Sequence, residues 1–459
     1  MATPSFALLD GNNFYCACER VFNPKLLGQP LVVLSNNDGC AIARSEEAKA
    51  LGIRMGAPWF QIEHLERSAG LIAHSANFEL YGDMSRRMMN VAEPMGCGLE
   101  VYSIDECFID MTGIPHATER ARHTRAQVLQ QVGIPTCIGI GPTKTLAKLA
   151  NHIAKSADRK PGSYPIQLAQ VCNLQDMTPK QLSWLFKRTE VGEVWGVGPR
   201  IAKQLQQLGV HTVEDLRVLD PHLIQQRWSV VLERTVRELN GTPCLGLDDH
   251  PAPKQNIACT RSFGQAVTEL ADLREAVSTF ASRAAHKARQ QGSVAESVLV
   301  FVRTSPFRAQ DAQYSRSHVM PLRLPVSDTL SITAAALQAL ARIYKPGYRY
   351  AKAGVMLLNL HSHTTVQTEL DLGDNATNQA HKQDRLMLAM DQVNARFGKG
   401  TLKVASAGVC MANEPRSAWH MKQERRSPRY TTRWNELLEI GQHDPKYPTN
   451  ATVGTPPAQ

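Results

Sequence analysis

The chain has 459 residues, and its 51 Lys and Arg exceed its 42 Asp and Glu to give a formal net charge of +9. Hydrophobic residues make up 43% and charged residues 20%, which excludes a disordered chain, and the length suggests roughly three or four domains. No apolar run approaches the roughly 18–20 residues of a membrane-spanning helix, and we expect neither a membrane segment nor a signal peptide.

Cysteine usage points to a reducing compartment. The 10 cysteines form no C-x-x-C pair, which argues against zinc-ribbon and thioredoxin-like sites. The single C-x-C sequence, Cys16 and Cys18, has no matching His or Cys cluster elsewhere. We therefore expect reduced, inert thiols in a cytoplasmic protein. The net charge permits a nucleic-acid partner without requiring one.

Strands and helices are predicted to alternate up to about residue 165. Apolar runs predict strands and amphipathic spacing predicts helices. The expected strands lie at 5–10, 30–35, 99–104, 107–111 and 136–140, and the helices at 77–93, 117–132 and 143–154. This order predicts a mixed α/β fold with helices stacked on a sheet.

The second half of the chain changes character twice. Residues 170–240 are predicted to be helical, and the sequence VWGVG at 194–198 directly precedes a helix at 199–208. A proline-rich linker at 242–255 marks a boundary. Beyond it the expected order is a strand from 257, helix 270–290, strands 297–303 and 317–324, helix 329–343 and strand 351–360. That βαββαβ order predicts a split-βαβ domain, followed by a helical patch at 383–397.

Two adjacent carboxylates form the sharpest local feature. Asp105 and Glu106 interrupt two apolar strands where a tight hairpin would place them on the rim of the sheet, and Asp10 ends the first strand. Carboxylates at such strand ends can hold Mg²⁺ ions, which would activate a 3′-hydroxyl and stabilise leaving pyrophosphate. Acidic residues are also common in plain hairpin turns, so spacing alone leaves that alternative open.

Four segments carry a resemblance to a known family. In chain order they read LLDGNNFYCACE, VVLSNNDGCAIARSEEAKALGIRMG, YSIDECFIDMTG and GIGPTKTLAKLANHIAK. Together they resemble the Y-family translesion DNA polymerases, and among them the UmuC-type catalytic subunit of bacterial DNA polymerase V and its mobile-element relatives. The resemblance runs from about residue 5 to about residue 435.

The resemblance implies a right-hand polymerase of α/β (α+β) class, with a ferredoxin-like palm, small fingers, a helical helix-hairpin-helix thumb and a βαββαβ little finger. The implied ranges are palm 1–20 and 78–170, fingers 21–77, thumb 171–241, linker 242–256, little finger 257–360, partner-binding region 361–440 and a disordered end 441–459.

The same resemblance assigns the catalytic centre. Asp10, Asp105 and Glu106 match the metal-binding carboxylates, and the backbone carbonyl of Gly11 is implied as a further ligand, so two Mg²⁺ ions are expected as cofactors. Phe14 and Tyr15 are both expected to bind the nucleotide substrate. Tyr15 falls at the position whose ring blocks the ribose 2′-hydroxyl, although a plain core aromatic would look the same in the sequence.

Three basic residues are candidates for the incoming triphosphate. Lys155 matches the position at which the family contacts the triphosphate, whereas a solvated basic helix face explains Lys144 and Lys148 equally well. Lys49 stands where many relatives have an arginine, and a lysine loses bidentate geometry. Arg44 is therefore a rival candidate, and the sequence leaves the choice open.

DNA contacts are expected from two modules. Gly196 and Gly198, before a helix, resemble a helix-hairpin-helix loop whose backbone N–H groups approach a phosphate, although a bare G-x-G is common in loops. Arg261 and Arg303, in predicted little-finger strands, could face template phosphates, and the alternative is ordinary surface charge.

Partner contacts are expected near the carboxyl terminus. Gln367, Leu370 and Leu372 fit a Gln-x-x-Leu-x-Leu peptide that resembles a sliding-clamp-binding motif. Residues 416–434 mix six basic with three aromatic side chains, and SPRYTTR at 427–433 resembles a UmuC segment. There the family implies a processed UmuD-type dimer and a RecA filament, while single-stranded DNA would suit the same composition.

These features predict an error-prone, template-directed DNA polymerase that acts on primer-template DNA and dNTP in the SOS response. The location expected for it is bacterial, cytoplasmic and nucleoid-associated. Two alternatives stay open at this point. One is a catalytically silent DNA-binding scaffold of the same fold, and the other is a metal-dependent nuclease that uses the same acids.

Overall fold

The structure is a computed structural model, and it describes residues 3–248, 252–308, 310–363, 375–408 and 419–437. The chain divides into two compact units. Unit 1 comprises Met1–Leu34, Cys40–Asp249 and Arg425–Gln459, and unit 2 comprises Ser35–Gly39 and His250–Glu424. Within the described ranges, no helix is both long and apolar enough to cross a membrane.

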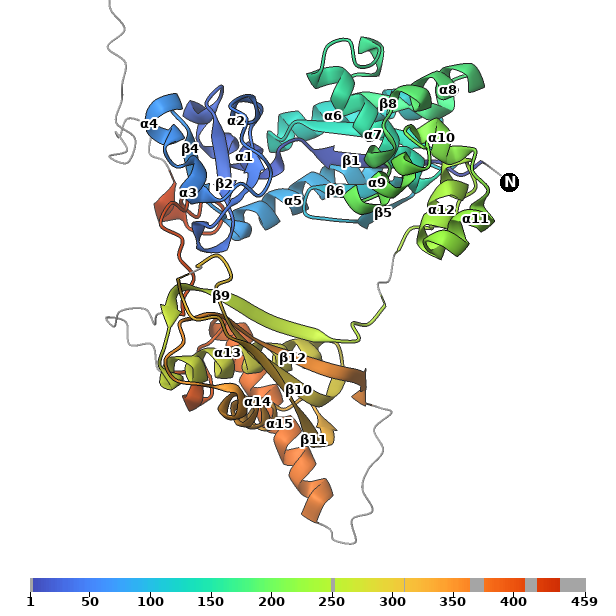
Figure 1. The fold of residues 1–459 in the computed structure, drawn as a ribbon. Coiled ribbons are helices and arrows are strands. Elements are labelled where there is room, and N and C mark those ends of the chain that lie inside the picture. The colour runs from blue at the N-terminus through green and yellow to red at the C-terminus, as the bar shows by residue number, and fades with distance from the viewer. Residues whose placement is uncertain (1–2, 249–251, 309, 364–374, 409–418, 438–459) are drawn as a thin grey trace, which may run out of the picture. The chain divides into compact units, whose positions relative to one another are not determined.

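A five-stranded sheet in the order β5-β6-β1-β7-β8 forms the centre of unit 1 (Figure 1). Its strands are β1 (Phe6–Gly11), β5 (Gly98–Val101), β6 (Glu106–Asp110), β7 (Thr136–Gly141) and β8 (Val171–Asn173). The main helices beside it are α1 (Phe14–Phe22), α5 (Phe78–Ala92), α6 (Ala117–Val132) and α7 (Lys144–Arg159). The central strand β1 is antiparallel to both of its neighbours.

Strand β1 is buried on both faces, which explains its nearly continuous apolar sequence. Ala7 and Leu9 belong to the core cluster that contains residues of α5 and α6, while Phe6 and Leu8 cluster with Ala147 of α7. The sheet is therefore covered by helices on both faces, and only the ends of its strands can carry polar groups.

Two smaller groups of elements complete unit 1. A three-stranded sheet, β3-β2-β4, consists of β2 (Leu31–Leu34), β3 (Ala41–Arg44) and β4 (Ile72–Ser75), with short helices α2 (Glu46–Ala50), α3 (Trp59–Ile62) and α4 (Leu65–Ala69). A helical group contains α8 (Pro179–Arg188), α9 (Pro199–Gln207), α10 (Val213–Arg217), α11 (Pro221–Arg227) and α12 (Val230–Leu239).

Unit 2 is built on a four-stranded antiparallel sheet in the order β11-β10-β12-β9. Its elements are β9 (Ile257–Val267), α13 (Leu270–Gln290), β10 (Ser293–Thr304), β11 (Ser315–Val326), α14 (Thr329–Ile343), β12 (Tyr350–Ser362) and α15 (Asn375–Phe397). Because each neighbouring pair is antiparallel, β9 and β10 run parallel with β12 between them. This arrangement confirms the predicted split-βαβ domain.

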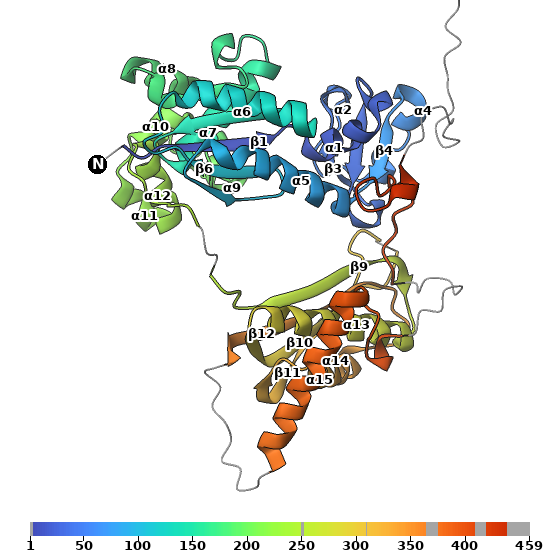
Figure 2. The ribbon, with the colours of Figure 1, turned by 180° about the vertical axis from the view of Figure 1, so that it is seen from behind.

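The carboxy-terminal segment, which we define as residues 425–437, packs onto unit 1. Ser75 at the end of β4 and Arg426 form a parallel bridge, although about 350 residues separate them in the chain. Figures 1 and 2 both place this red segment beside the blue strand β4. The predicted clamp-binding peptide and residues 441–459 lie outside the described residues.

Most of the predicted elements are present. Helix 117–132 is α6 and helix 270–290 is α13, each with the expected bounds, while the helix expected at 143–154 extends to residue 159. The strand expected at 99–104 ends at Val101, because the next residues form a turn in which the N–H groups of Tyr102 and Ser103 donate to the Glu106 carbonyl. The hairpin that we expected at the two carboxylates is therefore confirmed.

Candidate active site

Three carboxylates meet at one end of the central sheet. In the register of β1 and β6, Asp10 lies opposite Glu106. The N–H of Gly11 donates to the carbonyl of Asp105 at 2.8 Å, so the hairpin turn is attached to the end of β1. A Cβ at Gly11 would lie 2.8 Å from the Phe14 ring, which explains the small residue after Asp10. The fold therefore brings together carboxylates that are 95 residues apart in the sequence.

Two lysines of α7 balance these carboxylates. The Nζ of Lys155 lies 2.5 Å from Oδ2 of Asp10, and the Nζ of Lys148 lies 2.8 Å from Oε2 of Glu106. Lys148 also lies 4.7 Å from the centroid of the Tyr102 ring. The seven-residue spacing places both lysines on one face of the helix, as the 3.6-residue period requires. Lys148 therefore does not belong to a solvated helix face.

The electrostatics of the two facing carboxylates differ. Burial raises the pKa of Asp10 to about 7, and the hydrogen bond with Glu106 acts in the same direction while Lys155 opposes it. Burial also acts to raise the pKa of Glu106, but its hydrogen bonds with Asp10 and Lys148 outweigh that effect and lower it. Near neutral pH Asp10 is therefore the carboxyl that still binds a proton, and a cation at this site would displace that proton.

Asp105 is oriented by its own turn. Its Oδ1 accepts a hydrogen bond from the Ser103 hydroxyl at 2.6 Å, and the same hydroxyl oxygen accepts from the N–H groups of Asp105 and Glu106. Among the described side chains, no group of three or more His, Cys, Asp or Glu is arranged to hold a metal ion. The oxygen donors suit a hard cation, yet a three-carboxylate ligand set would need the Asp105 side chain to turn away from Ser103.

Tyr15 and Phe14 lie in different surroundings at the start of α1. Phe14 is buried in the main core cluster, whereas Tyr15 is half-buried. The Tyr15 ring stacks on the Tyr81 ring, with centroids 4.5 Å apart and planes 14° apart, and its edge meets Phe78 at 6.0 Å. Tyr15 is thus a partly exposed ring with a firm support beneath it.

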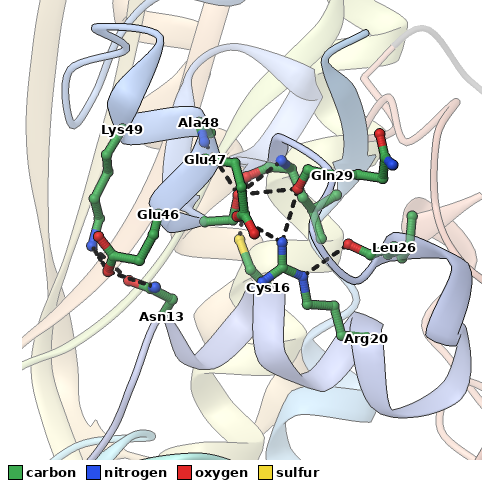
Figure 3. A network of polar contacts seen from close by, with 11 residues as sticks. Asn13, Cys16, Arg20, Leu26, Gln29, Glu46, Glu47, Ala48 and Lys49 are labelled. Atoms are coloured by element: carbon green, nitrogen blue, oxygen red, sulfur yellow. Dashed lines mark hydrogen bonds and ion pairs between the residues drawn. The ribbon is translucent and has the colours of Figure 1, made fainter. Parts of the chain in front are cut away.

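The two rival cations of the second segment point to different partners. The Nζ of Lys49 donates to Oδ1 of Asn13 at 2.7 Å and to Oε1 of Glu46 at 2.8 Å, as Figure 3 shows. Asn13 directly precedes α1, so Lys49 lies close to the helix that carries Tyr15. Arg44 instead donates to the carbonyl of Ile53 at 2.7 Å.

A second ion pair in Figure 3 joins α1 to α2. The guanidinium of Arg20 donates to Oε2 of Glu47 at 2.8 Å and to the carbonyls of Leu26 and Gln29. The Arg20 guanidinium therefore binds groups of the protein itself. Arg20 therefore helps to fix the loop that follows α1.

The glycines of the VWGVG sequence occupy a tight loop before α9. Gly196 has a φ of +88°, a backbone conformation that favours glycine, and Gly198 is the N-cap residue of α9, where Pro199 is the first helical residue. A Cβ at Gly198 would meet no atom within 4 Å. Gly196 and Gly198 are both exposed. Trp195, directly before Gly196, packs against Tyr102 with ring centroids 5.6 Å apart.

Arg303 and Arg261 lie on opposite faces of the unit 2 sheet. Val302 is buried beneath the helices and pairs with Ala353, which in turn pairs with Arg261. Because paired residues share a face, Arg261 lies on the helix-covered face. Its guanidinium is 5.7 Å from the ring of buried Trp419.

Arg303 is exposed and lies on the other face. Its register partner on β12 is Lys352, so two cations stand side by side on the face opposite to the one on which α13 and α14 pack. Their repulsion adds to the effect of burial in lowering the pKa of Lys352. Of the two predicted DNA-contacting arginines, Arg303 therefore lies on the face away from α13 and α14.

The basic residues of the carboxy-terminal segment are largely paired. Arg425 pairs with Glu66 and lies 4.8 Å from the centroid of the Trp59 ring, while Arg429 pairs with Glu436 at 2.6 Å. Tyr430 is buried, whereas Trp434 is 89% exposed. The segment combines internal packing with one exposed aromatic side chain.

The cysteines match the expectation of inert thiols. All nine that the structure describes are free, and most are buried. Burial raises the pKa of Cys16, Cys107 and Cys172 to about 12. Such thiols remain protonated and unreactive at neutral pH.

Family models match much of the chain. Models of the impB/mucB/samB family match residues 9–152, and those of its C-terminal domain match residues 254–370. A domain of unknown function matches residues 384–440, which includes the carboxy-terminal segment. The match therefore covers the carboxylate site, the unit 2 sheet and the end of the described chain.

Curated relatives extend over nearly the whole chain. Protein UmuC of Salmonella typhimurium strain LT2 is 44% identical over 95% of this chain and all of its own length. Protein ImpB of Salmonella typhimurium is 42% identical over 94% of this chain and 98% of its own. The fold resembles that of a Y-family DNA polymerase chimera of Dbh and Dpo4, with a TM-score of 0.58, 18% identity, and coverage of 78% of this chain and 99% of the other. The chain therefore belongs to the impB/mucB/samB family, whose curated relatives include UmuC.

Proposed function

We propose that this chain extends a primer opposite damaged template bases in the SOS response, and that Asp10, Asp105 and Glu106 hold two Mg²⁺ ions during nucleotidyl transfer. The observation that carries the proposal is the pairing of Asp10 with Glu106 across β1 and β6, with the Asp105 backbone bonded to Gly11. When bound, the ions supply charge neutralisation at the transferring phosphoryl group.

The residues present fit these ions. The carboxylates of Asp10 and Glu106 each lie within 2.8 Å of a lysine ammonium group, so their oxygens already bind a positive charge. Asp105 adds a third carboxylate and the Gly11 carbonyl adds a neutral oxygen, which completes a set of hard donors. Lys155 would then be free to bind the triphosphate as a point charge.

The nucleotide would be oriented from the side of α1. We assign Tyr15 to the exclusion of the 2′-hydroxyl and Lys49 to the triphosphate, because Lys49 lies beside Asn13 at the start of the helix that carries Tyr15. Phe14 would hold that helix start in the core. Arg44 is the weaker candidate, since its guanidinium is bonded to the Ile53 carbonyl.

DNA would contact both units. In unit 1 the loop with Gly196 and Gly198 offers backbone N–H groups to a phosphate. In unit 2 Arg303, together with Lys352, offers paired positive charge on the sheet face away from α13 and α14. A DNA contact by Arg261 remains a prediction, and the position of Arg261 on the helix-covered face does not favour it. Positive groups of this kind make DNA binding weaken as salt rises.

Partner proteins complete the proposed role. The likeness to UmuC suggests a processed UmuD-type dimer and a RecA filament as activators, and the peptide with Gln367, Leu370 and Leu372 suggests a sliding clamp. Exposed Trp434 is a side chain that a protein partner or single-stranded DNA could cover.

Primer extension on an abasic template tests the proposal. The full chain is combined with its UmuD-type partner, RecA filament and Mg²⁺, and the double variant Asp105→Ala with Glu106→Ala is expected to lose extension by about 100-fold or more. The matched control is Asp83→Ala, which removes a surface carboxylate of α5 that pairs with Arg87.

Three outcomes distinguish the alternatives. Extension that is lost in the double variant and kept in Asp83→Ala supports the polymerase. Shortened DNA strands that depend on the same acids would indicate a nuclease. Neither extension nor cleavage, with DNA binding retained in parent and variants alike, would indicate a catalytically silent scaffold and overturn the proposal.

A further inference from the structure

A buried chain of polar groups lies beneath Tyr15. The Tyr15 ring stacks at 4.5 Å on Tyr81, whose side chain is 0% exposed. Tyr81 therefore cannot move without its neighbours, and its position decides where the Tyr15 ring rests. The polar contacts that hold Tyr81 in place also fix the support of Tyr15.

Glu19 is the centre of those contacts. The Tyr81 hydroxyl donates to Oε1 of Glu19 at 2.7 Å, and the Ser427 hydroxyl donates to the same oxygen at 3.0 Å. Asn77 Nδ2 donates to Oγ of Ser427 at 3.0 Å. Glu19 is 1% exposed, and a buried carboxylate keeps a defined position only while its donors remain in place.

Ser427 is itself held from both sides by the carboxy-terminal segment. On one side the backbone of Arg425 exchanges two hydrogen bonds with Ser75, at 3.0 and 3.1 Å. On the other side the Tyr430 ring stacks on Phe22, with centroids 4.8 Å apart and planes 5° apart. The segment is thus attached to the rest of unit 1 on both sides of Ser427, at Arg425 and at Tyr430, and this fixes the position of the Ser427 hydroxyl beside Glu19.

We infer that Ser427 and Tyr81 are positioning residues for sugar selection, and that the carboxy-terminal segment thereby belongs to the nucleotide site. This inference rests on the proposed role of Tyr15 in excluding the 2′-hydroxyl. A ring excludes one extra oxygen only while its position is fixed to within a fraction of an ångström. Loss of either hydrogen bond to Oε1 of Glu19 lets Tyr81 tilt, and Tyr15 moves with it.

The experiment compares dATP with ATP in single-nucleotide primer extension by the full chain with its UmuD-type partner and RecA filament. The measured quantity is the ratio of kcat/KM for the two nucleotides. Tyr81→Phe keeps the ring and removes only the hydroxyl, and Ser427→Ala removes only the other donor to Glu19. Each is expected to lower discrimination by roughly 3- to 10-fold, the range that one hydrogen bond spans, with kcat/KM for dATP nearly unchanged.

Two further variants test whether the hydroxyl itself matters. Ser427→Thr keeps the hydroxyl that Ser427→Ala removes, and it is expected to keep most of the discrimination. Thr432→Ala removes a hydroxyl from an exposed residue of the same segment and is expected to leave discrimination at the parental level. Thermal unfolding of each variant identifies any general loss of folding, and Tyr81→Phe tests the inference independently of the carboxy-terminal segment.

The Tyr15→Ala variant separates this inference from the function on which it rests. If Tyr15→Ala loses discrimination while Tyr81→Phe and Ser427→Ala keep the parental ratio, sugar exclusion by Tyr15 stands and the positioning role is overturned. If Tyr15→Ala keeps the parental ratio, the proposed role of Tyr15 fails, and the positioning role fails with it. Equal losses for dATP and ATP in Ser427→Ala would show a structural role only.

Discussion

The buried carboxylate of Glu19 makes the stability of this chain depend on pH. Burial raises the pKa of Glu19 above its usual value of 4.5, although His74 and the hydroxyls of Tyr81 and Ser427 oppose that effect. A carboxyl whose pKa is higher in the folded state favours folding most when it is protonated. The contribution is therefore largest below about pH 4.5 and is lost as pH rises through the folded-state pKa.

Glu19→Gln is expected to change this pH dependence. Glutamine keeps an oxygen that accepts from Tyr81 and Ser427, but it does not titrate. The melting temperature of the variant, relative to the parent, is expected to rise as the pH increases above about 4.5 and to level off once the pH exceeds the folded-state pKa of Glu19. Scanning fluorimetry at unit pH steps measures the difference.

The control for this prediction is Glu214→Gln. A hydrogen bond from Arg217 lowers the pKa of Glu214, so this group is already ionised in both folded and unfolded chains above pH 5. The difference in melting temperature between Glu214→Gln and the parent should stay constant over the same pH range. If the difference in melting temperature between Glu19→Gln and the parent also stayed constant, the raised pKa of Glu19 would be contradicted.

Residue chemistry was predictable where a local pattern carried it. Asp10, Asp105 and Glu106 stand at strand ends, and the i, i+7 spacing of Lys148 and Lys155 gives them one helix face. The pairing of Lys148 with Glu106 was missed, because a basic helix face looks the same whether it is solvated or bonded. Ser427 and Glu19 are 408 residues apart, and no local signal connects them.

Helix α7 and strand β7 approach each other unusually closely. A Cβ at Gly139 would lie 2.1 Å from the backbone nitrogen of Asn151 and 2.3 Å from the carbonyl oxygen of Ala147. These are backbone atoms, which cannot turn away as a flexible side chain can. The glycine therefore sets how close α7, which carries Lys148 and Lys155, lies to the sheet.

Gly139→Ala is expected to push α7 away from β7. The overpacking should lower the free energy of unfolding by at least about 2 kcal/mol. Displacing the two lysines by about 1 Å should lower primer extension by up to roughly 100-fold. Gly82→Ala in α5 is the control, because a Cβ there meets no atom within 4 Å and alanine favours a helix. Equal stability of the two variants would refute the close-packing argument.

The positions of helices and strands were easier to predict from the sequence than the side of the sheet on which a given side chain lies. Periodicity over 15 or more residues located α6 and α13, because burial of one helix face requires that repeat. Arg261 shows the limit. Strand alternation places it with buried Cys259 and Phe263, but the sequence cannot say which face of the sheet the helices cover.

At the scale of the molecule, the two compact units differ in how the chain builds them. The core cluster of unit 2 uses residues between Ile257 and Trp419. The main core cluster of unit 1 includes residues near the start of the chain and Tyr430, so it is complete only with the carboxy-terminal segment. Removing that segment should therefore affect one unit and spare the other.

A chain that ends at Glu424 tests this expectation. It loses the buried Tyr430 ring and the donors that Ser427 and Arg425 provide, which should destabilise unit 1 by about 3 kcal/mol. Hydrogen exchange is expected to accelerate in α1 and α5 and to stay unchanged in α13 and α14. Equal acceleration in both units, or in neither, would contradict a unit-specific role.

The late position of Ser427 and Tyr430 in the chain has a consequence for synthesis on the ribosome. Glu19 and Phe22 leave the ribosome about 400 residues before the groups that contact them, so a nascent chain lacks the Ser427 donor to Glu19 and the ring that stacks on Phe22 until Tyr430 has been synthesised. Products of interrupted translation would lack the support beneath Tyr15. Correct sugar selection would then be confined to chains whose translation had continued past Tyr430.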